Sequence, residues 1–160
     1  MEKNEKTNVM RLLEQRRISY TPHYYDPTCT DGERIAALLN EDPDMTFKTL
    51  VTTDGKKHYF VFVIPVNKAL HLKKAAKAAG VKSIAMIPQK ELLPLTGYIH
   101  GGCSPIGMKK KFLTFIDQSV LNHPYMLCSA GKVGTQIEVA VEDLVHFVEA
   151  KCADLATEKE

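Results

Sequence analysis

The stretch Phe47–Ile64, FKTLVTTDGKKHYFVFVI, decides the fold. Its first part, Phe47–Thr53, and its last part, Lys57–Ile64, are rich in β-branched and aromatic residues, and Asp54-Gly55 lies between them. An Asp-Gly pair between two such runs predicts a β-hairpin with a two-residue turn. The last six residues of the stretch are all apolar, which predicts a strand covered on both faces.

Helix signals lie on both sides of this hairpin. Thr7 can cap a helix with an apolar stripe, and Thr30-Asp31-Gly32-Glu33 matches a capping box for a second helix. An alanine-rich helix over Leu72–Ala79 is expected to end at Gly80. Further strands are expected over 18–26, 82–87, 112–116, 125–129 and 136–141. Further helices are expected after Pro88 and from Glu142, and the tail from Ala153 is expected to be frayed.

This irregular mixture of strands and helices predicts the fold class. The chain has no internal repeat and no linker, so we expect one domain over residues 1–160. A central hairpin argues against a doubly wound parallel sheet. We therefore predict an α+β fold with a mixed, barrel-like sheet flanked by helices.

Composition excludes several classes of protein. Apolar residues make up 44% and charged residues 25%, which is typical of a globular protein, and a net charge of +2 excludes a nucleic-acid binder that relies on global charge. The first residues contain no apolar signal core, and no apolar run is long enough to span a bilayer. The four cysteines, at 29, 103, 128 and 152, form no C-x-x-C pair. These features favour a reduced, cytoplasmic protein.

The loop Gly97–Lys111, GYIHGGCSPIGMKKK, is built for contact with a ligand. Its glycines let the backbone approach a ligand closely, and its lysine run favours an anion. The alternative is a surface loop before a solvated lysine run. Cys103 lies within this loop, and we interpret it as a packing residue.

Three further positions allow two interpretations each. Lys48 opens a core strand, so it either faces an anion in a cleft or extends to water. The turn Ser129-Ala130-Gly131-Lys132 is either a second backbone wall of the same site or an ordinary hairpin turn. Tyr25 either stacks on a ligand or is a partly buried aromatic residue.

Metal and triad chemistry have no support in the pattern. The six histidines show no metal-ligand spacing and no paired carboxylate, so we expect surface or structural roles and no metal or other cofactor. No Ser/His/Asp order and no phosphate-binding P-loop occurs.

Three motifs together indicate a family. Phe47-Lys48-Thr49-Leu50, the GGCSPIG segment at 101–107 and SAGKVG at 129–134 closely resemble the YbaK/EbsC family, freestanding relatives of the editing domain in bacterial prolyl-tRNA synthetases. The resemblance covers about Lys6 to Asp154. It implies an α+β fold with a site between the lysine strand, the glycine loop and the SAGK turn.

The resemblance also implies roles for individual residues. Lys48 matches the essential lysine of the family, which would hold the acceptor-end phosphate or the aminoacyl ester. Gly101 and Gly102 match the loop whose N–H groups face the ester. Ser129 and Gly131 match the opposing wall.

Two positions complete the implied substrate-binding set. Tyr25 matches an aromatic residue near the pocket of the family. Many relatives have Asp where this chain has Gln136. An acid/base role therefore does not transfer to this position, and Gln136 could only form hydrogen bonds.

Among the branches of the family, the chain is most similar to the Cys-tRNA(Pro) deacylases. The implied activity is removal of cysteine from mischarged Cys-tRNA(Pro), and also from Cys-tRNA(Cys), by attack of the substrate's own thiol on its ester. The implied partners are the acceptor end of the aminoacyl-tRNA and, transiently, prolyl-tRNA synthetase. The alternatives are a deacylase of another small amino acid, such as alanine on tRNA(Pro), and a non-catalytic module that binds aminoacyl-tRNA or nucleotide.

Overall fold

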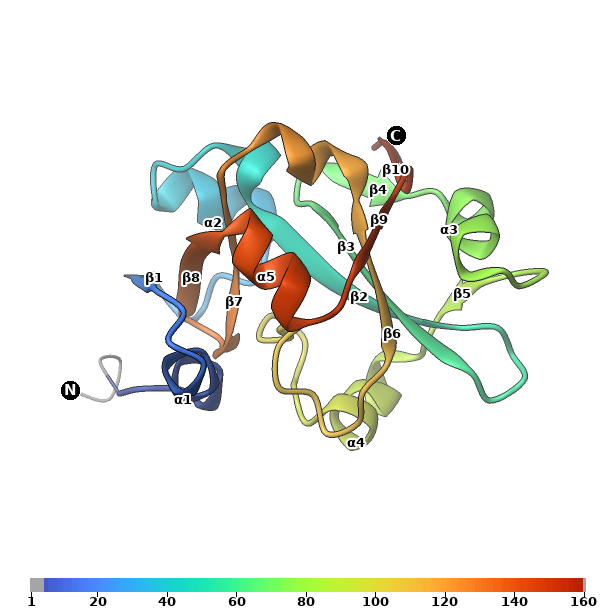
Figure 1. The fold of residues 1–160 in the computed structure, drawn as a ribbon, viewed down its shortest axis with the longest axis horizontal. Helices are drawn as coiled ribbons and strands as arrows, with labels where there is room; N and C mark the ends of the chain where they lie inside the picture. Colours follow the sequence, from blue (N-terminus) through green and yellow to red (C-terminus); the bar gives the residue numbers. More distant parts are fainter. Residues whose placement is uncertain (1–4, 160) are drawn as a thin grey trace.

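A mixed five-stranded sheet forms the centre of the computed structural model, which describes residues 5–159 (Figure 1). Its strand order is β5-β2-β3-β6-β9. The hairpin strands β2 and β3 are antiparallel, whereas β6 runs parallel to both β3 and β9. The strands of this sheet are β2 (Phe47–Thr53), β3 (Tyr59–Pro65), β5 (Ala85–Met86), β6 (Leu113–Asp117) and β9 (Lys151–Ala153).

Two smaller sheets complete the β structure. One has the order β1-β8-β7 and is antiparallel, and the other pairs β4 with β10. A single bridge between Thr46 and Leu127 joins the start of β2 to β7. The strands are β1 (Tyr20–Tyr24), β4 (Lys68–Leu70), β7 (Tyr125–Lys132), β8 (Thr135–Ala140) and β10 (Ala156–Glu158).

Short helices cover these sheets, and local signals set their ends. The hydroxyl of Thr7 accepts a hydrogen bond from the N–H of Met10 at the start of α1, and Gly80 ends α3 in the left-handed conformation, as predicted. The helices are α1 (Asn8–Gln15), α2 (Gly32–Leu38), α3 (Leu72–Ala79), α4 (Leu92–Thr96) and α5 (Val141–Phe147), with 3₁₀ turns η2 (Pro43–Met45), η3 (Gln89–Glu91) and η4 (Gln118–Asn122).

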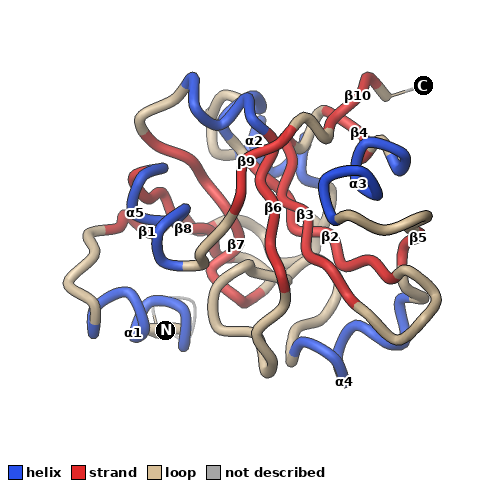
Figure 2. Tube along the Cα trace, turned by 45° about the vertical axis from the view of Figure 1, so that its right-hand side comes forward, coloured by secondary structure: helices blue, strands red, loops and turns tan. Residues whose placement is uncertain are grey.

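Strand β3 separates two apolar cores, which confirms the prediction of a strand covered on both faces. Val61 and Val63 pack into the core shared with α1, α5, β7 and β8, whereas Phe60, Phe62 and Ile64 pack into the core beneath α3. Helices α3 and α5 accordingly lie on opposite sides of the central sheet (Figure 2). The alternation follows from the two-residue period of a strand.

The hairpin is present, but the predicted two-residue turn is wrong. Thr53 pairs with Tyr59, so five residues, 54–58, form the connection. The carboxylate of Asp54 accepts hydrogen bonds from the N–H groups of Lys56 and His58, at 2.7 and 3.2 Å. These side-chain hydrogen bonds stabilise a wider loop than the Asp-Gly pair alone predicts.

Two further local expectations are corrected. Asp31 rather than Thr30 caps α2, because its carboxylate accepts the N–H of Arg34 at 3.2 Å. The tail is also not frayed over the described residues, since β9 joins the central sheet and β10 pairs with β4. Residues 1–4 of the predicted polar lead lie outside the described residues.

No helix within residues 5–159 is both long and apolar enough to cross a membrane.

Candidate active site

Five of the seven residues singled out in the sequence line one pocket. It is a small cavity of about 160 Å³ between the start of β2, the start of α2, the glycine loop and the β7–β8 hairpin. Segments far apart in sequence therefore converge, as the three motifs together predicted. The five residues are Tyr25, Lys48, Gly101, Ser129 and Gln136.

The glycine loop and the β7–β8 turn are in direct contact. A Cβ atom at Gly102 would lie 3.1 Å from the backbone nitrogen of Val133. A Cβ atom at Gly101 would lie 2.9 Å from the Thr30 methyl group, and Gly101 has a φ of +87°. Only glycine therefore allows the loop to approach both the turn and the segment before α2 at this distance.

Gly102 and Gly131 do not line the pocket. Gly131 has a φ of +89°, and a Cβ atom there would lie 3.0 Å from both Tyr98 and Val9. Its N–H donates to the hydroxyl of Ser129 at 3.1 Å. These two glycines therefore support the pocket wall from behind.

Lys48 is half-buried at the pocket, and burial is the main reason that its pKa lies below the ordinary value for lysine. Lys159 lowers the pKa of Lys48 further, whereas Glu33 and Asp31 oppose this shift. Lys159 itself forms an ion pair with Glu33. The C-terminal strand thus brings a second cation close to Lys48, which the sequence did not predict.

Two buried polar atoms at the pocket have no hydrogen-bond partner among residues 5–159. They are Oε1 of Gln136 and Oγ1 of Thr49, and both residues line the cavity. A buried polar atom left unpaired is costly, so these atoms are suited to bind a polar group of a ligand. The sequence analysis did not single out Thr49, although it directly follows Lys48 in the strand.

The pocket contains no activated thiol. Cys103 lines the cavity, but burial raises the pKa of its thiol to about 12. A thiol with this pKa is protonated at neutral pH and is a poor nucleophile. The interpretation of Cys103 as a packing residue is consistent with this environment.

The lysine run lies outside this pocket. Lys110 and Lys111 line a separate cavity of about 380 Å³ with Arg16 and His146. Lys111 is also paired with Glu149. The lysine run is therefore separate from the cavity that Gly101 lines, whereas Gly107 of the same loop lines the cavity of Lys110 and Lys111.

Comparisons with known proteins identify the family of the chain. Residues 26–147 match the family described as aminoacyl-tRNA editing domain. A candidate Cys-tRNA(Pro)/Cys-tRNA(Cys) deacylase of Enterococcus faecalis, EbsC, is 40% identical over 157 residues, which cover 97% of this chain and 96% of the relative. A proline–tRNA ligase of Campylobacter fetus subsp. fetus is 21% identical over 85% of this chain and 24% of the ligase.

A solved structure shows the same fold. It is that of a candidate trans-editing enzyme for prolyl tRNA synthetase, which superimposes with a TM-score of 0.83 at 22% identity over 93% of this chain and 94% of the other. Together with the family match, this fold makes the chain an editing domain of the mixed α/β class, and the predicted fold class is confirmed. The chain belongs to the aminoacyl-tRNA editing family. The predicted enzyme class, aminoacyl-tRNA deacylase, is confirmed with it.

Proposed function

We propose that this protein removes cysteine from mischarged Cys-tRNA(Pro), and from Cys-tRNA(Cys), by cleaving the aminoacyl ester. One observation carries the proposal. The pocket combines a half-buried lysine and unpaired polar atoms with a cysteine whose thiol stays protonated. Such a site can hold and polarise an ester, but it offers no activated thiol of its own.

The substrate supplies the nucleophile in this proposal. The cysteine sulfur attacks the carbonyl carbon of its own ester, so a C–S bond forms and the C–O bond to the terminal ribose breaks. The thiol proton passes to the departing ribose oxygen, and the products are a cyclic thiolactone and free tRNA. No water is consumed in this step. Because the thiol is already tethered, positioning alone supplies a large part of the rate enhancement.

The pocket residues have distinct roles in this mechanism. The ammonium group of Lys48 stabilises the negative charge that develops on the ester or holds the acceptor-end phosphate. The backbone of Gly101, supported by Gly102, faces the ester. Oε1 of Gln136 and the hydroxyl of Ser129 accept hydrogen bonds from the amino group or the ribose. Tyr25 shapes the pocket itself, and Gly131 supports its wall from behind.

The proposal extends to a partner. Phosphate contacts position a nucleic acid without reading its bases, and the net charge of +2 provides little global attraction. Selection of tRNA(Pro) therefore comes from a transient complex with prolyl-tRNA synthetase, with the tRNA between the two proteins. The proposal includes a cytoplasmic location, where the protein would meet newly made aminoacyl-tRNA.

The test is deacylation of Cys-tRNA(Pro) and Ala-tRNA(Pro) by the purified protein. We expect loss of cysteine but not of alanine, because alanine has no thiol. Lys48→Met should slow the reaction by about a hundredfold or more, the range for loss of one electrostatic contact to the transition state. The matched control is Lys73→Met, an exposed lysine on α3, which should leave the rate unchanged. Release of alanine would contradict the thiol mechanism and indicate attack by water instead. Release of neither amino acid would refute the proposed activity.

A further inference from the structure

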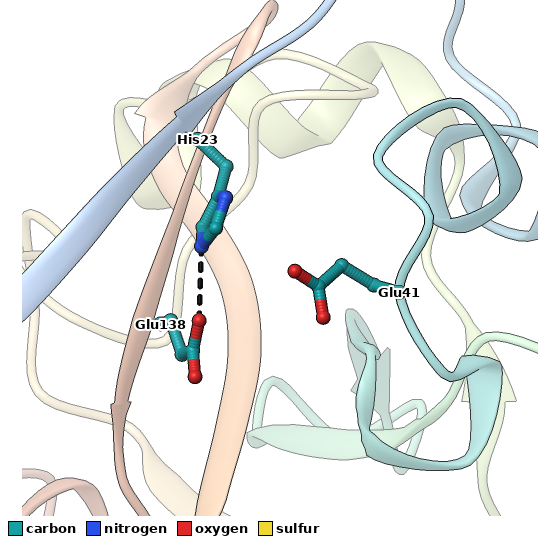
Figure 3. A group of neighbouring side chains, drawn as sticks. All are labelled: His23, Glu41 and Glu138. Atoms are coloured by element: carbon teal, nitrogen blue, oxygen red, sulfur yellow. Dashed lines mark hydrogen bonds and ion pairs between the residues drawn. The ribbon is translucent and has the colours of Figure 1, made fainter.

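Three side chains outside the pocket converge from three separate segments. His23 lies on β1, Glu138 on β8 and Glu41 in the connection after α2 (Figure 3). One ligand atom from each lies within 4.8 Å of the other two. Nε2 of His23 and Oε1 of Glu138 are 3.0 Å apart. The carboxylate of Glu41 points toward this pair across a gap (Figure 3).

The sheet register explains why His23 and Glu138 meet. In the antiparallel pair of β1 and β8, His23 lies opposite Gln136, and Thr21 lies opposite Glu138. Residues 136 and 138 are two apart, so both project from the face that carries His23. His23 and Glu138 are therefore diagonal neighbours on one face. The spacing of 115 residues between them hides this arrangement in the sequence.

Glu41 is held near the pair by the end of α2. Its backbone N–H donates to the carbonyl oxygen of Ala36 at 2.8 Å, and Asn40 before it adopts a positive φ of 56°. This tight turn directs the chain back toward the β1–β8 sheet. The side chain of Glu41 belongs to an irregular connection and can adjust its position more easily than a residue within a strand.

The charges of this cluster are unbalanced. Two carboxylates share one imidazole, and no lysine or arginine within residues 5–159 forms an ion pair with Glu41 or Glu138. The side chains of His23 and Glu138 are only 22% and 30% exposed. Such a concentration of acceptors favours a cation.

We propose that His23, Glu41 and Glu138 bind a divalent transition-metal ion, for which zinc is the best match. One imidazole nitrogen with two carboxylate oxygens suits zinc, whereas calcium and magnesium prefer oxygen ligands alone. Zinc bonds of about 2.0–2.2 Å at the tetrahedral angle place neighbouring ligand atoms about 3.3–3.6 Å apart. The pair His23–Glu138, at 3.0 Å, needs to open by only a few tenths of an ångström, and a movement of Glu41 toward this pair completes the site.

The ion would act as a clamp rather than in the deacylation step. Gly32 and Ile35 of α2 line the pocket, and Glu41 follows the end of this helix. The bound ion would link Glu41 to His23 on β1 and to Glu138 on β8. This link would fix α2, which forms one wall of the pocket, to the sheet that carries Ser129 and Gln136. The clamp is thus independent of the chemistry proposed for the pocket.

The experiment titrates the full, chelator-treated chain with zinc chloride in a calorimeter. We expect one site, and Glu41→Gln, Glu138→Gln and His23→Gln should each weaken binding by about tenfold or more. The matched control is His58→Gln. His58 pairs with Asp54 on the surface without a third ligand, so this change should leave the affinity unaltered.

A spectroscopic readout and a folding control separate this site from adventitious binding. Cobalt in place of zinc should give no thiolate charge-transfer band, because no cysteine belongs to the site. Glu41→Gln lies in a connection and should fold normally by circular dichroism, so its result is decisive. Absence of binding, full binding by Glu41→Gln or a thiolate band would overturn the proposal.

Discussion

Replacement of Asp117 should release the C-terminal segment from the body of the protein. Asp117 ends β6 and is only 5% exposed. Its Oδ1 accepts hydrogen bonds from the N–H groups of Leu155 and Ala156, both at 3.0 Å, and its Oδ2 accepts one from Ser119 at 3.2 Å. A single carboxylate therefore holds both η4 and the chain that leads into β10.

The expected cost of Asp117→Ala follows from these three contacts. Each buried donor left without a partner costs about 1–3 kcal/mol, and loss of the helix cap costs about 1 kcal/mol. The sum is about 3–7 kcal/mol of the free energy of unfolding, which corresponds to a fall in Tm of about 6–28 °C for a chain of this size. Asp117→Asn keeps one acceptor oxygen and should lose about half as much.

Calorimetric melting measures this effect, and Asp154→Ala is the matched control on the same tail. Asp154 forms an exposed ion pair with Lys74 at 3.0 Å, so its loss should cost less than about 1 kcal/mol. Limited proteolysis at Lys151 should also become faster in Asp117→Ala alone. An equal fall in Tm for the two alanine variants would refute the view that Asp117 anchors the tail.

Three further predictions concern the pocket. Because burial lowers the pKa of Lys48, the unfolded chain binds its proton more tightly, so wild-type stability should rise with pH between the lowered pKa and the ordinary lysine value. Lys48→Met should then be more stable than wild type in urea melts at neutral pH, and this difference in stability should shrink at alkaline pH. A difference that stays the same at alkaline pH would contradict the reasoning. Gly102→Ala places a methyl group 3.1 Å from the nitrogen of Val133, so the glycine loop must move away from the β7–β8 turn by a few tenths of an ångström. This displacement of the pocket wall should lower kcat/KM by about tenfold or more. Gly55→Ala at the open hairpin tip is the control and should affect stability only. Cys103→Ser should retain kcat within about threefold, since a thiol with a pKa of about 12 is not a nucleophile at neutral pH. A fall in kcat of about a hundredfold would assign the attack on the ester to Cys103 instead.

Local patterns were sufficient for the elements that local physics controls. The alternation and apolar content of Phe47–Thr53 and its partner strand predicted β2 and β3 because side-chain direction repeats every two residues. Helix α3 was predicted over its full length, since Gly80 provides a left-handed cap at little cost. The hairpin loop was predicted less well, because the hydrogen bonds of the Asp54 side chain determine its length.

The motifs predicted much of the pocket, but only the fold shows which positions reach it. Lys48 and Gly101 line the cavity, whereas Gly131 supports it from behind against Tyr98. Thr49 was missed, because nothing in the sequence shows that its hydroxyl lies buried without a partner.

The sequence by itself determined the fold class, the hairpin at its centre and the family, because these depend on periodicity and on motifs that are contiguous in the chain. Tertiary structure alone decided the ordered tail, the position of Lys159 near Lys48 and the meeting of His23, Glu41 and Glu138. Each of these depends on contacts between residues far apart in sequence. Strand register and the path of the chain set such contacts, and no local pattern records them.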